Sequence, residues 1–145
     1  MRKSTILLVE DNPDDEALTL RALKSHNLAN EVIVARDGSQ ALDYLFRAAE
    51  GKSGETAVLP ELVLLDIKLP GIDGLEVLRR LRQNPHTRRL PVVMLTSSVE
   101  ETDRLASYDL GANSYVRKPV DFVEFSEAIK QLDLYWLVLN VASPY

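Results

Sequence analysis

The sequence predicts an α/β fold of the flavodoxin-like, doubly wound type, with five parallel strands in the order 2-1-3-4-5 and helices on both faces of the sheet. Three observations support this prediction. Short apolar runs, typical of strands covered on both faces, alternate along the chain with segments whose apolar residues recur at helical spacing. The strand-like runs end in charged or hydroxyl side chains. With 145 residues, the chain is long enough for one such domain and too short for two.

The first strand is expected at Thr5–Val9, and two carboxylates, Glu10 and Asp11, follow it directly. A helix should then run from Asp14 to about His26, because acidic side chains in the first turn of a helix complement its dipole. The apolar residues expected on its inward face are Ala17, Leu20, Ala22 and Leu23.

Residues with branched side chains predict the second strand at Glu31–Ala35, and Asp37–Gly38 is a typical turn sequence. A second helix is predicted after this turn by apolar residues at three- and four-residue steps, namely Ala41, Leu42, Leu45 and Phe46. The segment Gly51–Glu55 has no phosphate-binding pattern, and we interpret it as a surface loop.

The third strand, Leu62–Asp66, is the centre of the predicted fold. Its four consecutive apolar residues cannot form the alternating face of a half-exposed sheet, so both faces should be buried. In open α/β sheets, ligands bind just outside the carboxyl ends of the strands, which is where Asp66 stands. Pro70–Gly71 predicts a turn, and a helix should follow Asp73–Gly74 and stop before Pro85. Its inward residues are Leu75, Leu78 and Leu81.

The fourth strand is expected at Val92–Leu95, and it ends at a hydroxyl side chain, Thr96, where earlier strands end in carboxylates. A short helix over residues 100–109 should close at Gly111, a residue type favoured in the left-handed conformation after a helix. A fifth, weaker strand is expected at Asn113–Val116.

This strand order should bring Glu10, Asp11, Asp66, Thr96 and Lys118 together at one edge of the sheet. Crowded carboxylates repel one another and stay ionised when a cation shares their site. Oxygen ligands without cysteine or a nearby histidine favour Mg²⁺. Lys118 adds a second positive charge, and Thr96 a hydroxyl that can donate to an anion. The group is therefore suited to attack by Asp66 on a phosphoryl group, which gives an aspartyl phosphate.

Simpler interpretations exist for each residue taken alone. Asp11 and Asp73 could be helix caps, Lys118 could belong to an ordinary loop, and Thr96 could merely end a strand. The combination at four strand ends favours the functional interpretation. His26 and His86 lie near predicted exposed helix ends without plausible partners, and we interpret both as surface residues.

Several motifs occur together in this chain: Glu10–Asp11 after the first strand, Asp66, the run Leu69-Pro70-Gly71-Ile72-Asp73-Gly74, Thr96, Gly111–Ala112 and Lys118–Pro119. Together they resemble the receiver domain of a two-component response regulator, over about residues 4–132. The resemblance implies that Asp66 is the phosphoacceptor and that Asp11 and Asp66 bind Mg²⁺ through their side chains. Glu10 would act through water, and the backbone carbonyl of Lys68 would be the third protein ligand. Glu10 is a mild departure, since aspartate is commoner there.

The same resemblance implies three further roles. Lys118 would pair with the phosphoryl group, and Thr96 and Tyr115 would form the switch pair that moves on phosphorylation. Such a protein is a phosphoacceptor that catalyses only its own phosphorylation and dephosphorylation, and is not otherwise an enzyme.

The last helix should begin near Asp121, with an inward stripe of Phe122, Phe125, Ile129, Leu132 and Trp136. From Leu134 to Leu139 the chain is apolar all round, so another surface must cover it. We therefore expect a receiver domain at residues 1–133 and an apolar extension at 134–145. The extension could fold back onto its own domain, but a homodimer or partner interface is favoured. Tyr135, Trp136 and Leu137 would be the interface residues.

This extension resembles stand-alone regulators associated with phytochrome-type histidine kinases. The expected function is therefore phosphoryl transfer from a sensor histidine kinase, of the phytochrome type on this resemblance, to Asp66, with signalling through protein contacts. The alternative is a constitutively dimeric binding module in which phosphorylation is secondary.

Composition narrows the possible partners and location. The net charge of −5 and the lack of a basic block argue against direct contact with nucleic acid. No apolar run reaches the roughly 20 residues that span a bilayer, and the N-terminus lacks a signal-peptide pattern, so we expect a cytoplasmic protein without membrane contact. The absence of cysteine excludes disulfides and thiol chemistry.

The sequence disfavours two enzyme classes. A flavin-binding protein of this fold needs a phosphate loop after the first strand, where the acidic segment 10–15 would repel a phosphate. A hydrolase of the haloacid dehalogenase kind usually has a second acid two residues after its nucleophile, and that position is Lys68.

Overall fold

The computed structural model describes residues 5–26, 31–50, 59–97 and 111–132. Its sheet has five parallel strands in the order β2-β1-β3-β4-β5. The strands are β1 (Thr5–Val9), β2 (Glu31–Ala35), β3 (Leu62–Asp66), β4 (Val92–Thr96) and β5 (Ser114–Arg117). The doubly wound, flavodoxin-like fold predicted from the sequence is therefore confirmed.

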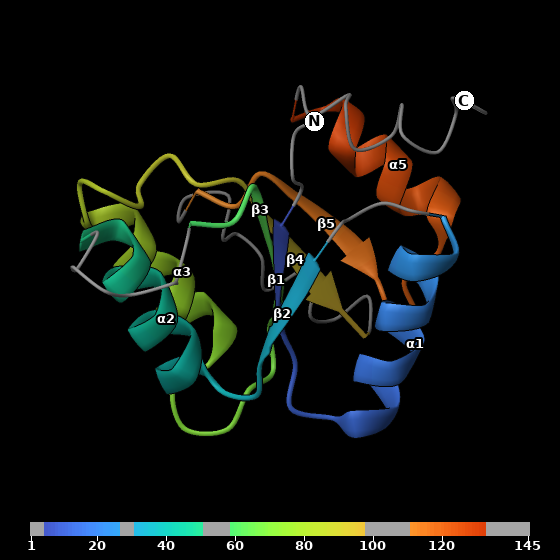
Figure 1. Cartoon of the computed structure of the whole chain (residues 1–145), viewed down its shortest axis with the longest axis horizontal. Helices are drawn as coiled ribbons and strands as arrows, with labels where there is room; N and C mark the ends of the chain where they lie inside the picture. The colour runs from blue at the N-terminus through green and yellow to red at the C-terminus, as the bar shows by residue number, and fades with distance from the viewer. Residues whose placement is uncertain (1–4, 27–30, 51–58, 98–110, 133–145) are drawn as a thin grey trace.

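Helices cover both faces of this sheet (Figure 1). They are α1 (Pro13–Ser25), α2 (Gly38–Glu50), α3 (Gly74–Gln83) and α5 (Phe122–Lys130). Helices α1 and α5 lie on one face, and α2 and α3 lie on the other (Figure 1). The helix expected at residues 100–109 and the extension expected at 134–145 lie outside the described residues, whereas the positive φ of Gly111 agrees with its expected conformation.

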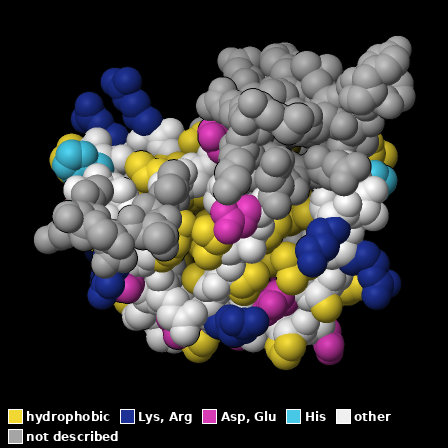
Figure 2. Space-filling view, viewed as in Figure 1, with side chains coloured by type: hydrophobic (Ala, Val, Ile, Leu, Met, Phe, Trp, Pro, Cys, Tyr) yellow, Lys and Arg dark blue, Asp and Glu magenta, His cyan; other side chains and the backbone are white. Residues whose placement is uncertain are grey.

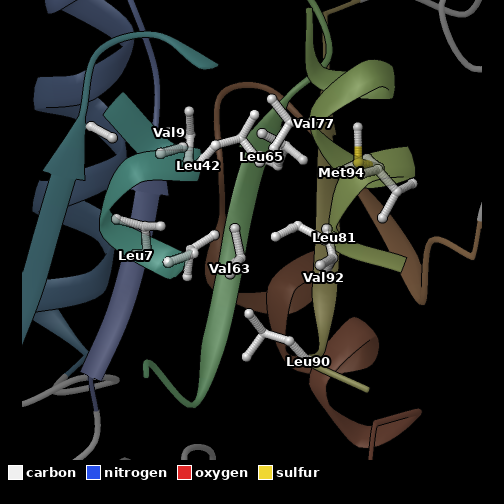
Figure 3. Packing of buried hydrophobic residues seen from close by; sticks show 14 of the residues in the cluster. Leu7, Val9, Leu42, Val63, Leu65, Val77, Leu81, Leu90, Val92 and Met94 are labelled. Carbon is white, nitrogen blue, oxygen red and sulfur yellow. The ribbon is translucent and has the colours of Figure 1, made fainter. Parts of the chain in front are cut away.

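The three inner strands, β1, β3 and β4, are buried on both faces, as their continuous apolar runs predict. In β1, Leu7 and Val9 face the layer beneath α2 and α3, while Ile6 and Leu8 face the layer beneath α1 and α5. The first layer is drawn in Figure 3, where side chains from β1, β3 and β4 interlock with those of α2 and α3. Each fully buried aliphatic side chain contributes about 1.5–3 kcal/mol to the stability of the fold. The two apolar layers therefore hold the strands, and the residues at their ends, in fixed positions.

Side-chain caps fix where the helices begin. The side chain of Asp73 accepts a hydrogen bond from the backbone N–H of Glu76 at 2.9 Å, so the capping interpretation of Asp73 is correct. For Asp11 it is wrong, because the cap of α1 is its neighbour Asn12, followed by Pro13 at the first helical position. The Asp11 carboxylate is therefore not used as the cap of α1.

The sheet has a partly open edge at β2. Apolar side chains reach the surface there between charged ones (Figure 2), and Val32, Ile33 and Val34 are only half buried. An ion pair of 3.0 Å between Arg36 and Glu16 links the end of this strand to α1. Charged residues beside an edge strand discourage pairing with another sheet.

His26 is not the unaccompanied residue that the sequence suggested. Its ring stacks on Phe122 with 4.4 Å between ring centroids, which links the end of α1 to the start of α5. His86 is exposed, as expected. None of the helices in the described part of the chain combines the length and apolar character needed to cross a bilayer.

Candidate functional site

The sheet's hydrogen bonds extend past the strand ends and position the candidate residues. The backbone N–H of Glu10 donates to Ala35 at 3.0 Å, and that of Lys118 donates to the carbonyl oxygen of Thr96 at 2.7 Å. The residue after Asp66, Ile67, donates to Leu95 at 3.2 Å. Because these bonds continue the parallel ladder, residues from strands far apart in sequence meet at one edge.

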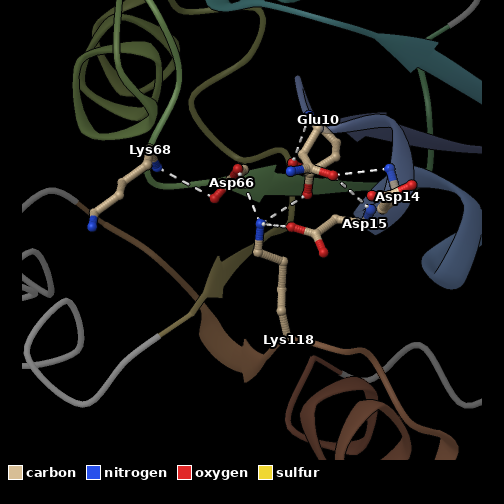
Figure 4. A network of polar contacts seen from close by, with 7 residues as sticks. Glu10, Asp14, Asp15, Asp66, Lys68 and Lys118 are labelled. Atoms are coloured by element: carbon tan, nitrogen blue, oxygen red, sulfur yellow. Dashed lines mark hydrogen bonds and ion pairs between the residues drawn. The ribbon is translucent and has the colours of Figure 1, made fainter.

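Lys118 lies at the centre of this edge, where its ammonium contacts three carboxylates (Figure 4). Its Nζ lies 3.1 Å from Glu10 Oε1, 2.9 Å from Asp15 Oδ2 and 3.2 Å from Asp66 Oδ2. The Lys118 side chain is only 10% exposed, so water screens these charges poorly. The ammonium therefore offsets much of the negative charge gathered here.

Asp66 is buried and firmly held. Its second oxygen, Oδ1, accepts a hydrogen bond of 3.3 Å from the backbone N–H of Lys68. The first turn of α3 packs so closely on the end of β3 that a Cβ atom at Gly74 would lie 2.1 Å from the Asp66 carbonyl oxygen. Only glycine permits this approach, and it fixes the backbone that carries the Asp66 carboxylate.

Glu10, Asp11 and Asp66 form a group of carboxylates that could hold a metal ion. One oxygen from each lies within 4.8 Å of the others. Glu10 and Asp66 are buried, whereas Asp11 is exposed and opens the group to solvent. Carboxylate oxygens suit a hard divalent cation such as Mg²⁺, which keeps several waters and needs only one or two protein carboxylates. The donor set therefore fits the expected cofactor.

The electrostatics of the site reflect this crowding. Burial, reinforced by the charge of Asp66, raises the pKa of Glu10 to about 7, although Lys118 opposes the shift. Burial also raises the pKa of Asp66, with Lys118 again lowering it. For Lys118 burial lowers the pKa, but its contacts with Asp15, Asp66 and Glu10 outweigh burial and raise it. Added positive charge would help keep both acids ionised.

The two residues expected to form a switch lie on neighbouring strands. Thr96 is buried at the end of β4 beside Arg117 of β5. Tyr115 is half buried, pairs in register with Met94 and packs against the apolar layer beneath α2 and α3. Since Met94 and Thr96 are two residues apart, Thr96 and Tyr115 face the same side of the sheet.

The structure brings Glu10, Asp11, Asp66 and Lys118 together at the carboxyl edge, with Thr96 at the end of β4. It adds one residue that the sequence analysis missed. Asp15 was expected only to complement the dipole of α1, whereas it makes the shortest of the three contacts to Lys118. Its place in the first turn of α1, just after the carboxylates that end the first strand, was a possible signal. The expected interface residues Tyr135, Trp136 and Leu137 lie outside the described residues.

Comparisons with known proteins agree on one family. Residues 6–130 match the response regulator receiver domain. The chain is 39% identical over 132 residues to the response regulator Rcp1 of Synechocystis sp., which covers 91% of this chain and 88% of that protein. The crystal structure of the Mn²⁺-bound form of Rcp1 matches with a TM-score of 0.71 and 38% identity over 92% of this chain and 94% of that chain.

Two further solved structures belong to similar regulators. The bacteriophytochrome response regulator AtBRR matches with a TM-score of 0.84 and 52% identity, over 94% of this chain and 96% of that chain. The phosphorylated cyanobacterial phytochrome response regulator RcpA matches with a TM-score of 0.74 and 36% identity, over 95% of this chain and 96% of that chain.

Proposed function

The chain belongs to the response regulator receiver family, and we propose that it acts as a stand-alone receiver that accepts a phosphoryl group on Asp66 from a sensor histidine kinase of the phytochrome type. The contact that carries the proposal is the 3.2 Å between Lys118 Nζ and Asp66 Oδ2, beside the carboxylates of Glu10 and Asp11. The phytochrome-type kinase is supported by the similarity to AtBRR, RcpA and Rcp1.

The proposed transfer uses Asp66 as the nucleophile. A carboxylate oxygen of Asp66 forms a bond to phosphorus while the P–N bond of the kinase phosphohistidine breaks, and the imidazole nitrogen keeps the bonding electron pair. The ammonium of Lys118 lies beside Asp66 and offsets charge on the phosphoryl oxygens. Apart from transfer to and loss from Asp66, we propose no catalytic activity.

Glu10, Asp11 and Asp66 would hold the divalent cation. In the roles that the family resemblance implies, Asp11 and Asp66 bind it directly, Glu10 binds it through water, and the Lys68 backbone carbonyl completes the protein ligands. When bound, Mg²⁺ supplies charge neutralisation at the phosphoryl group. The Mn²⁺-bound structure of Rcp1 supports a divalent cation in a related protein.

Output through protein contacts completes the proposal. We divide the chain into a receiver domain at 1–133 and an extension at 134–145 whose apolar residues, with Tyr135, Trp136 and Leu137, form a homodimer interface. Thr96 and Tyr115 would pass the phosphorylation state of Asp66 toward that interface. A cytoplasmic location without membrane or nucleic-acid contact remains part of the proposal.

Phosphorylation is tested by intact mass after incubation with acetyl phosphate and Mg²⁺. The wild-type protein is expected to gain one phosphoryl group, and Asp66→Asn none. Asp73→Asn is the matched control, because asparagine still caps α3 and the acid lost lies outside the contacts of Lys118. An unmodified wild-type protein, or modification of Asp66→Asn, would contradict the proposal.

The apolar run at 134–139 favours one other candidate, a constitutive dimer in which phosphorylation is secondary. Sedimentation velocity separates the two functions. We expect phosphorylation to change the association state or the affinity for a partner, with no such change in Asp66→Asn. A dimer whose sedimentation is unchanged by phosphorylation and by Asp66→Asn would favour the constitutive module.

A further inference from the structure

Asp15 is held at the edge of the site by the first turn of α1. The side-chain oxygen of Asn12 accepts hydrogen bonds from the backbone N–H of Asp14 at 2.8 Å and of Asp15 at 3.0 Å. In an α-helix the Cα–Cβ bonds tilt toward the N-terminus, so an acid in the first turn leans back toward the preceding strand end. The Asp15 carboxylate accordingly reaches Lys118 (Figure 4).

The Lys118 ammonium has no donor to spare. An ammonium has three N–H donors and no acceptor. Three carboxylates accept from it, those of Glu10, Asp15 and Asp66. A phosphoryl group on Asp66 brings new anionic oxygens that also need a donor from Lys118. Phosphorylation removes the charge of the Asp66 carboxylate itself, so one phosphoryl oxygen can take over the donor that Asp66 used. The remaining anionic oxygens of the phosphoryl group then compete with Glu10 and Asp15 for the other two donors.

The degree of burial determines which carboxylate loses its hydrogen bond from Lys118 at the lower cost. The two carboxylates that remain are Glu10, whose side chain is 0% exposed, and Asp15, whose side chain is 33% exposed. A buried carboxylate that loses its cation is left uncompensated, which is strongly unfavourable. A partly exposed carboxylate can turn to water and recover hydration. Asp15 is therefore the partner that Lys118 can lose at the lowest cost.

We propose that Asp15 is a positioning residue that competes with the phosphoryl group for Lys118. It holds the ammonium over Asp66 before phosphorylation and releases it afterwards. The inference rests on the proposed function of Asp66 as phosphoacceptor and adds a residue that opposes the phosphorylated state. A charge at position 15 thus sets how strongly the site retains an anionic group.

The test compares the affinity of the protein for beryllofluoride, an anionic phosphoryl mimic, in the presence of Mg²⁺. Asp15→Asn keeps the side-chain size and removes the charge. We expect it to bind beryllofluoride about threefold to tenfold more tightly than the wild type, by calorimetric titration. Asp14→Asn is the matched control, since Asp14 lies in the same turn and has no ion pair to Lys118 among the described contacts. It should stay within about twofold of the wild type.

A second readout separates competition from a general effect on α1. The ¹⁵N resonance of Lys118 Nζ should differ between wild type and Asp15→Asn before beryllofluoride is added. After beryllofluoride is added, the Nζ resonances of the two proteins should have the same chemical shift, because Asp15 has then released the ammonium in the wild type. A purely structural effect would leave the difference in place, and loss of an acid from the first turn would affect Asp14→Asn equally.

The outcomes are distinct. Unchanged or weaker affinity of Asp15→Asn, or a persistent difference in the Nζ resonance, would overturn the inference while leaving phosphorylation of Asp66 intact. If the wild type and Asp14→Asn bind no beryllofluoride, the proposed function itself fails, and the role of Asp15 falls with it.

Discussion

Replacing Lys118 by methionine is expected to lower the free energy of unfolding by roughly 3 kcal/mol at about pH 8, because a buried ion pair that loses one partner leaves uncompensated charge. Here the groups left behind include Glu10 and Asp66, both buried and both with raised pKa values even when Lys118 is present. Methionine has nearly the same length as the aliphatic part of lysine, so the packing around the chain is largely kept. The loss is therefore mainly electrostatic.

The loss of unfolding free energy in Lys118→Met should become smaller as pH falls. The direction of this pH dependence follows from proton binding. Without Lys118, the folded-state pKa values of Glu10 and Asp66 rise further above their unfolded values. The folded variant then binds more protons than the unfolded chain at intermediate pH, so its stability falls as pH rises. Urea unfolding at about pH 5 and about pH 8 measures this difference.

A control for this substitution lies on α5. Lys130 pairs with Glu127 at 3.7 Å with exposed side chains, so Lys130→Met should change the free energy of unfolding by no more than about 0.5 kcal/mol. Equal losses for Lys118→Met at both pH values would contradict the electrostatic explanation, since simple loss of packing does not depend on proton binding.

Glu10→Gln is expected to act in the opposite direction, raising the free energy of unfolding at about pH 8 on the order of 2 kcal/mol when metal is removed by a chelator. The pKa of Glu10 is raised to about 7, chiefly by burial and then by Asp66. The stability that protonated Glu10 contributes is fully present below its unfolded pKa and is lost as pH rises through about 7. At about pH 8 the wild type therefore carries a buried, ionised Glu10 that destabilises the folded state. Glutamine stays neutral and keeps an oxygen that can accept from Lys118.

The expected signature is a flatter dependence of stability on pH between about 5 and about 8 in Glu10→Gln than in the wild type. Glu76→Gln is the control, because Arg79 and Arg80 lower the pKa of that partly exposed acid to about 2 and its substitution should bring no gain at the higher pH. Destabilisation of Glu10→Gln at about pH 8 would show that ionised Glu10 stabilises the site through Lys118 more than burial penalises it.

The sheet order and the meeting of Asp66 with Lys118 could be predicted because strand-like and helix-like segments alternate along the chain, which indicates a doubly wound sheet. Strands buried on both faces are recognisable by their lack of alternation, and a doubly wound sheet then brings their carboxyl ends together. Individual partners are harder to predict. The cap of α1 is Asn12 rather than Asp11, although both residue types suit that position.

The role of Asp15 could not be predicted for a related reason. Its contact with Lys118 joins residues 103 positions apart and depends on the orientation of the first turn of α1, which the cap determines. The stacking of His26 on Phe122 likewise depends on how α1 and α5 lie side by side. Periodicity predicts which face of a helix is buried, but it does not name the side chains that meet across two helices.

The most direct measurement of the central claim is the position of the phosphoryl group. Wild-type protein is phosphorylated with acetyl phosphate and Mg²⁺, reduced with borohydride to convert an acyl phosphate to homoserine, and digested for peptide mass mapping. We predict homoserine at Asp66, the carboxylate that shares Lys118 with Glu10 and Asp15. Homoserine at another aspartate with Asp66 unmodified would contradict the account.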